Sequence, residues 1–134
     1  MKIVQLPRKV WVGSHEFAVR LVSQDDLVLA GEDGDMTTDG TTGVISIAAD
    51  LDARRRLEIV LHELTHALNW SYEIEDGVSE EDIATKHGRA WAVFWLDNPR
   101  FESWLAYTLS RIRKEQRTGD DGSKAAAAQP KTDG

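Results

Sequence analysis

The chain of 134 residues contains no cysteine and no long run of apolar residues. Without cysteine it can form neither a disulfide framework nor a thiolate metal site, so any metal must bind to histidine, aspartate or glutamate. The first twelve residues hold only a brief apolar run before Pro7, which is too short for a signal peptide or a membrane span. We therefore expect a soluble protein that does not act in a membrane, with the cytoplasm as its location.

Positive charge is also scarce, because 16 Lys and Arg stand against 23 Asp and Glu and give a net charge of −7. The deficit lies in residues 1–110, where ten basic and nineteen acidic side chains give −9, whereas residues 111–134 carry six and four and give +2. An acidic body disfavours the phosphate backbone of a nucleic acid as the main partner.

The residues that are present suit one globular domain, since 41% are hydrophobic and 29% are charged. β-branched and aromatic runs predict strands in the first half of the chain. The expected strands cover residues 10–13 and 16–22, which form a hairpin, and residues 27–31 and 43–48. Residues 32–42 are rich in Gly, Asp and Thr, a composition that predicts a loop.

Apolar periodicity of the helical kind begins near residue 52 and continues to residue 69. Four leucines recur there on one helix face. They are Leu57, Leu61, Leu64 and Leu68. We expect this face to pack against the sheet.

Two further helices follow. Ser79 and Asp82 form a capping-box pattern that opens a helix reaching about Leu96. Asn98 and Pro99 supply a cap and a first helical residue for the next one. After residue 117 the composition changes to small and polar residues, which predicts a disordered tail over 118–134. The chain therefore predicts an α+β domain over residues 1–117.

Residues 62–66 read His-Glu-Leu-Thr-His and lie inside the first predicted helix. Two histidines four residues apart project from adjacent turns, so both imidazoles can reach one zinc ion (Zn²⁺) at about 2.0–2.1 Å. At about 100° per residue, His62 and His66 fall near 140° and 180° from Leu57, on a face separate from the leucines. Glu63 lies beside them, where a carboxylate can take a proton from a water molecule activated by the metal.

A catalytic zinc site needs a third protein ligand. The start of the second helix offers Glu80, Glu81 and Asp82, but Asp82 is expected to serve the cap. Glu81 is our prediction, with Glu80 and His87 as alternatives. Small residues on the face of Glu81 would let this helix approach the motif helix closely. They are Ala84, Thr85, Gly88 and Ala92.

The sequence resembles the zincin-like metallopeptidases of the gluzincin type, in which His-Glu-x-x-His is followed by a ligand glutamate on a second helix. It is most similar to small zincin-like proteins of phages and bacteria, through VGSHEFAV, LAGEDGD, GVISIA, LHELTHAL and DNPRFESWL. Matched residue by residue, the resemblance implies metal ligands at His62, His66 and Glu81 and a catalytic role for Glu63. It implies a minimal zincin fold with a mainly antiparallel sheet, and a strand edge at residues 43–48 that binds an extended peptide.

Together, motif and resemblance predict a zinc-dependent metalloendopeptidase that acts on a peptide or protein substrate. The alternative is a catalytically silent zincin-fold module that binds a partner, such as a phage-type regulator or adaptor. Its motivation is that about 117 ordered residues leave little room for a specificity domain, and that no transition-state donor is identifiable in the sequence.

Overall fold

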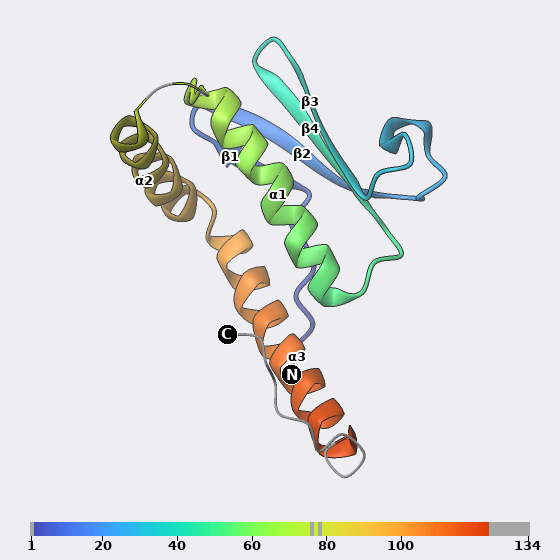
Figure 1. Ribbon diagram of the computed structural model, residues 1–134. Helices are drawn as coiled ribbons and strands as arrows, with labels where there is room; N and C mark the ends of the chain where they lie inside the picture. The colour runs from blue at the N-terminus through green and yellow to red at the C-terminus, as the bar shows by residue number, and fades with distance from the viewer. Residues whose placement is uncertain (1, 76, 78, 124–134) are drawn as a thin grey trace.

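In the computed structural model, which describes residues 2–75, 77 and 79–123, a four-stranded sheet is followed by three helices (Figure 1). The strands are β1 (Lys9–Val12), β2 (His15–Val22), β3 (Gly34–Asp39) and β4 (Thr42–Ala48). The helices are α1 (Ala53–Ser71), α2 (Glu80–Asp97) and α3 (Pro99–Ser123), and a short 3-10 helix, η1, covers Leu27–Leu29. The predicted α+β class is confirmed.

The sheet is mixed, with the strand order β1-β2-β4-β3. Its outer pairs, β1 with β2 and β3 with β4, are antiparallel hairpins that turn at Gly13 and Gly40. Both glycines have a positive φ, of 61° and 65°, which suits a residue without a Cβ atom. The central pair, β2 with β4, is parallel. The expected antiparallel character therefore holds for the outer pairs only.

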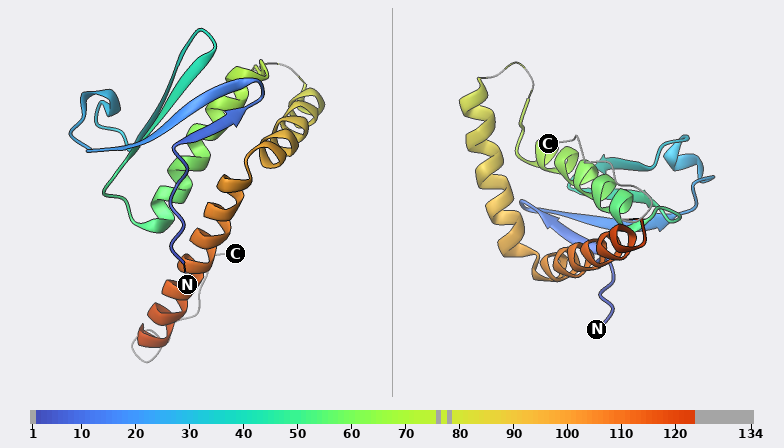
Figure 2. Two further views of the ribbon diagram at one scale, coloured as in Figure 1. Left: turned by 180° about the vertical axis from the view of Figure 1, so that it is seen from behind. Right: turned by 60° about the horizontal axis from the view of Figure 1, so that its bottom comes forward.

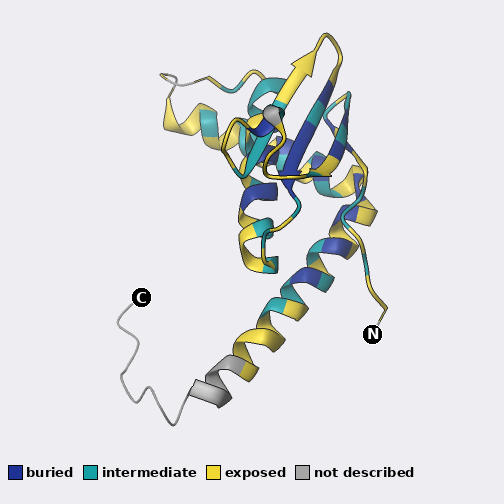
Figure 3. Cartoon of the chain, turned by 90° about the vertical axis from the view of Figure 1, so that its right-hand side faces the viewer, coloured by how far each residue is buried: buried dark blue, intermediate teal, exposed yellow. Residues whose placement is uncertain are grey.

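Helix α1 covers one face of the sheet, and α2 and α3 lie beside α1 (Figure 1, Figure 2). Alternate strand residues, among them Phe17, Val19, Ile45 and Ile47, form one core cluster with α1 (Figure 3). The buried face of α1 is rotated from the predicted one, since Leu57 and Leu61 are only partly buried. Its buried residues are Ile59, Val60, Glu63, Leu64, Ala67 and Leu68.

The strand predicted at residues 27–31 is wrong, because η1 occupies its place. The carboxylate of Asp26 accepts the N–H of Val28 at 3.0 Å and so starts a turn, which Ala30 and Gly31 end with positive φ. Leu29 is 1% exposed, so one buried side chain, rather than strand pairing, explains the apolar run.

The loop predicted at residues 32–42 is also wrong, because it contains β3. This strand lies at the edge of the sheet and is held by its backbone pairing with β4, so its exposed end can carry Thr37, Thr38 and Asp39. The strand edge expected at residues 43–48 is therefore wrong as well. That segment, β4, is paired on both sides, and β3 is the edge strand.

The helix starts agree with the predictions. Asp52 accepts the N–H of Arg55 at 2.8 Å and caps α1, and Ser79 accepts the N–H of Asp82 at 3.2 Å and caps α2. Helix α3 begins at Pro99 but runs on to Ser123, beyond the predicted domain end at residue 117. Residues 124–134 of the predicted tail lie outside the described residues. Within the described part, no helix is both long enough and apolar enough to cross a membrane.

Asn98, between α2 and α3, is 6% exposed and ties the helices to the sheet. Its carbonyl accepts the N–H of Phe101, as a cap does. Its side-chain amide faces β1, where Oδ1 accepts the N–H of Trp11 at 2.8 Å and Nδ2 donates to the carbonyl of Trp11 at 2.7 Å. The same Nδ2 donates to the carbonyl of Phe94 at 2.8 Å. The first strand and the helix junction are thereby joined.

Candidate metal centre

The exposed side of α1 carries His62 and His66 on adjacent turns. Their Nε2 atoms are 3.2 Å apart, and the ring centroids are 4.8 Å apart with nearly perpendicular planes. Two tetrahedral nitrogen ligands about 2.05 Å from a zinc ion lie about 3.3 Å from each other. The pair therefore fits two positions of a zinc site, although the same spacing suits an N–H···N hydrogen bond between neutral imidazoles.

Glu63 lies between this exposed face and the sheet and is 6% exposed. Its Oε2 is 4.0 Å from Nε2 of His62. Burial raises the pKa of Glu63 above its ordinary value, positive charge on His62 and His66 lowers it, and the carboxylates of Asp35 and Glu32 raise it again. The net effect is upward, so the side chain holds a proton at higher pH than a free glutamate does. This property suits a group that both takes and returns a proton.

The close approach of β3 to α1 sets one wall of the site, and it depends on Gly34. A Cβ atom on Gly34 would lie 2.6 Å from Cγ2 of Ile59 and 3.0 Å from Oε2 of Glu63. Any larger residue would have to push the edge strand away from the helix. Glycine at this position therefore keeps Glu63 covered.

The histidine pair and Glu63 open into a cavity of about 590 Å³, which we call the histidine cavity. The segment 32–36, Arg55 and Ile59 complete its lining. Arg55 is held by Asp33 at 3.1 Å and by Glu58 at 3.3 Å, and these hydrogen bonds raise the pKa of its guanidinium. The cavity is therefore acidic, and the one arginine in its wall is already paired.

Sequence reasoning missed the acidic wall, which consists of Glu32, Asp33 and Asp35. These residues follow no spacing that relates them to His62 or His66. They reach the motif helix because the edge strand pairs with β4, a contact between distant segments. The acid-rich composition of residues 32–35 was the only local signal.

The predicted third ligand, Glu81, is not gathered with the histidine pair. Glu80 and Glu81 are exposed in the first turn of α2, which begins beyond the C-terminal end of α1 (Figure 2). His87 is instead engaged with Asn69, at 2.8 Å between Nε2 and Oδ1. Across residues 2–75, 77 and 79–123, no three His, Asp or Glu side chains form a ready metal-binding group. Of the predicted site residues, the structure thus brings together His62, Glu63 and His66.

The exposure of α2 gives the physical reason. The small-residue face that Glu81 shares was expected to approach α1, but every one of its members is exposed. They are Ala84, Thr85, Gly88 and Ala92. The opposite stripe, with Ile83, His87, Trp91 and Phe94, turns inward, as expected for core residues. A row of small residues permits close packing but does not require it.

No protein-family model matches the chain, and neither does any curated protein or solved structure. What the site can do follows from its own chemistry.

Proposed function

We propose that the protein is a zinc-dependent metallopeptidase in which His62 and His66 hold the metal and Glu63 acts as the general base. The observation that carries the proposal is the 3.2 Å separation of the two Nε2 atoms beside a buried carboxylate. Either feature alone is common on helices. Their combination on one side of α1, open to a cavity, is typical of a catalytic zinc site.

When bound, zinc supplies a Lewis acid that polarises the scissile carbonyl and makes water a better nucleophile near neutral pH. Glu63 then takes the proton of the attacking water and returns it to the leaving amine. Glu63 is 6% exposed, so its carboxylate is largely shielded from bulk water while it holds that proton between the two steps.

The third ligand in this proposal is Glu81, which would reach the histidine pair only if α2 changed its place on α1. The alternative source is the acidic wall, because Glu32 and Asp35 already line the histidine cavity. The zinc affinity of single variants distinguishes these two sources of the third ligand. Glu81→Ala should weaken zinc binding in the first arrangement, and Asp35→Ala or Glu32→Ala should weaken it in the second.

The substrate is proposed to be an extended peptide or protein segment. Within the described chain the outer edge of β3 pairs with no other strand, and Gly34 of this strand lies directly against Glu63. A peptide that paired with β3 would pass beside the histidines. The acidic wall favours basic side chains in such a substrate.

The test compares Glu63→Gln with the wild-type protein by zinc content and by digestion of a peptide library. We expect the variant to keep zinc and to lose about 10²- to 10⁴-fold in cleavage rate, since the general base is gone. Glu102→Gln is the control, because Glu102 of α3 is exposed and lines neither cavity. Equal cleavage by Glu63→Gln and wild type would refute the proposal.

A second candidate is the silent binding module. The specific observation in its favour is that the described residues assemble two histidines and no third ligand. Such a module would retain a partner on the β3 edge and leave it intact. Binding without cleavage by the zinc-loaded protein would therefore favour the module over the peptidase.

A further inference from the structure

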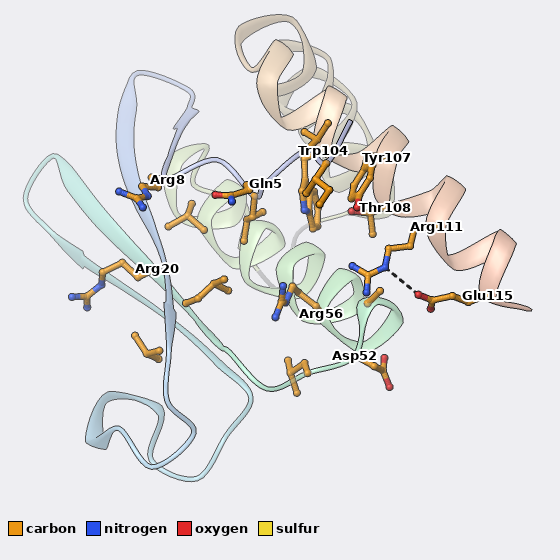
Figure 4. A pocket seen from close by; sticks show the side chains of 18 residues that line it. Gln5, Arg8, Arg20, Asp52, Arg56, Trp104, Tyr107, Thr108, Arg111 and Glu115 are labelled. Atoms are coloured by element: carbon orange, nitrogen blue, oxygen red, sulfur yellow. Dashed lines mark hydrogen bonds and ion pairs between the residues drawn. The ribbon is translucent and has the colours of Figure 1, made fainter. Parts of the chain in front are cut away.

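A second, larger cavity of about 890 Å³ lies at the N-terminal end of α1, and no residue that lines it also lines the histidine cavity. We call it the arginine cavity. Its walls come from residues 3–8, from β2, from the start of α1 and from α3 (Figure 4). Its volume lies within the range of small-molecule sites, about 300–1,000 Å³.

Much of this wall is apolar. Val19 and Trp104 are buried, Leu6 and Leu51 are partly buried, and all four line the cavity. Two aliphatic residues that also line it are exposed to water. They are Ile3, at 72% exposure, and Leu21, at 46%. A hydrocarbon group in the cavity would cover apolar surface that is now in contact with water.

The charge of the wall is opposite to that of the whole chain. Four arginines and two acids give 4 − 2 = +2, in a chain of net charge −7. The arginines are Arg8, Arg20, Arg56 and Arg111. Both acids are already engaged, since Asp52 caps α1 and Glu115 pairs with Nε of Arg111 at 3.0 Å, so that this arginine has one acidic partner and its other nitrogens remain to bind a ligand.

Arg56 lines this cavity and has one buried donor without a partner. Its Nη2 donates to the carbonyl of Ala49 at 2.6 Å, whereas its Nε is buried and has no hydrogen-bond partner within the described chain. Figure 4 shows Arg56 of α1 and Arg111 of α3 on the wall of this cavity, with Arg111 paired to Glu115. Guanidinium nitrogens of Arg56 and Arg111 that take no part in the contacts named above can donate to an anion in the cavity, whereas the buried Nε is out of its reach.

We propose that the arginine cavity binds a small amphipathic anion. Its carboxylate or phosphate pairs with Arg56 and Arg111, and its hydrocarbon part lies against Leu51 and Trp104. The guanidinium groups match an acidic head group, and the aliphatic and aromatic side chains of the wall match a hydrocarbon body. This site is independent of the proposed peptidase chemistry.

The test measures the binding of dodecanoate and dodecyl phosphate, below their micelle concentrations, to the full chain by calorimetry. We expect one molecule of at least one of the two anions to bind per chain, and dodecanol to bind at least about tenfold more weakly, since it lacks the charge. The preference between the two anions identifies the head group. No saturable binding of either anion, or equal binding of dodecanol, would overturn the proposal.

Variants locate the site. Arg56→Gln and Arg111→Gln should each reduce the affinity about tenfold. Arg54→Gln and Arg113→Gln are matched controls on the same helices, because both arginines are exposed and line neither cavity; they should change the affinity less than about twofold. Arg111→Gln keeps the Ala49 contact of Arg56, so it remains informative if Arg56→Gln fails to fold. Unchanged affinity in a folded Arg111→Gln, or preferred binding of a peptide carboxyl terminus, would contradict the assignment.

Discussion

The two cavities differ most clearly at two neighbouring residues of α1. Arg55 lines the histidine cavity and is bound by Asp33 and Glu58, whereas Arg56 lines the arginine cavity and keeps an unpaired Nε. Residues one apart on a helix point about 100° from each other, so the first turns of α1 divide two environments. One is acidic and surrounds imidazoles, and the other is basic and lined by both polar and apolar side chains.

This difference shows that the net charge of the chain does not predict the charge of each cavity wall. The net charge of −7 describes the surroundings of the histidine pair well, and the arginine cavity not at all. If the two cavities are independent, a change in one should leave the ligand of the other unaffected. The first of the following predictions tests that independence, and the others test the packing and charge of the histidine cavity, from the largest expected effect to the smallest.

His62→Ala should give the largest effect. Loss of one imidazole removes a proposed metal ligand, and even supporting groups around a metal are worth about 10- to 100-fold in affinity, so zinc affinity should fall about 100-fold or more. The affinity for dodecanoate should stay the same. Competition with a chromogenic chelator measures the first quantity, and calorimetry measures the second.

His15→Ala is the matched control for this experiment, because His15 lies on β2 and lines neither cavity. It should keep the wild-type affinity for zinc. Equal zinc affinity in His62→Ala and His15→Ala would remove the histidine pair from the proposed site.

Gly34→Ala should act on the histidine cavity through packing. The new methyl group would meet Ile59 and Glu63 at distances shorter than normal contacts, so the free energy of unfolding should fall by about 1–3 kcal/mol. Gly88→Ala is the control, because a Cβ atom there meets nothing within 4 Å on an exposed helix. It should raise the free energy of unfolding by about 0.5–1 kcal/mol. Chemical denaturation measures both, and a destabilised Gly88→Ala with a normal Gly34→Ala would contradict the packing described here.

The smallest effect concerns the stability of the metal-free protein as a function of pH. Because the pKa of Glu63 is raised in the folded state, the folded chain binds this proton more tightly than the unfolded chain does. The resulting stability is present below the ordinary glutamate pKa of 4.5 and is lost as the pH rises through the folded value.

Glu63→Gln carries no such charge, so at pH 7 the metal-free variant should be more stable than the metal-free wild type. The difference should shrink as the pH falls through the raised folded-state pKa towards 4.5, and it should stay constant at lower pH. Denaturation at several pH values in the presence of a chelator measures it. A variant that is less stable at pH 7 would show that the ionised carboxylate is stabilised by partners.

The helical half of the molecule was predictable because its signals are local. The spacing of His62 and His66, the caps at Ser79 and Asn98 and the leucine period depend on residues within a few turns. Strand β3 was not, since its pairing with β4 holds a segment that lacks apolar alternation. The small-residue face that Glu81 shares does exist, but it is exposed to water and does not pack on α1.

The arginine cavity could not be predicted from the sequence at all. Its wall contains Arg8, Arg56 and Arg111, which come from segments far apart in the chain and belong to no common motif. Its orphaned donor became visible only with the fold, because burial of Nε depends on several elements at once.

The amide of Asn98 has a consequence for how the sheet meets other molecules. By offering Trp11 one acceptor and one donor, it imitates the backbone of a neighbouring strand and closes the outer side of β1 at that residue. Pairing of another strand at Trp11 is thereby blocked, and among the described strands the margin that stays open is the outer edge of β3, beside the imidazoles. Asn98 would then limit self-association at β1 and leave β3 as the strand to which a peptide can pair.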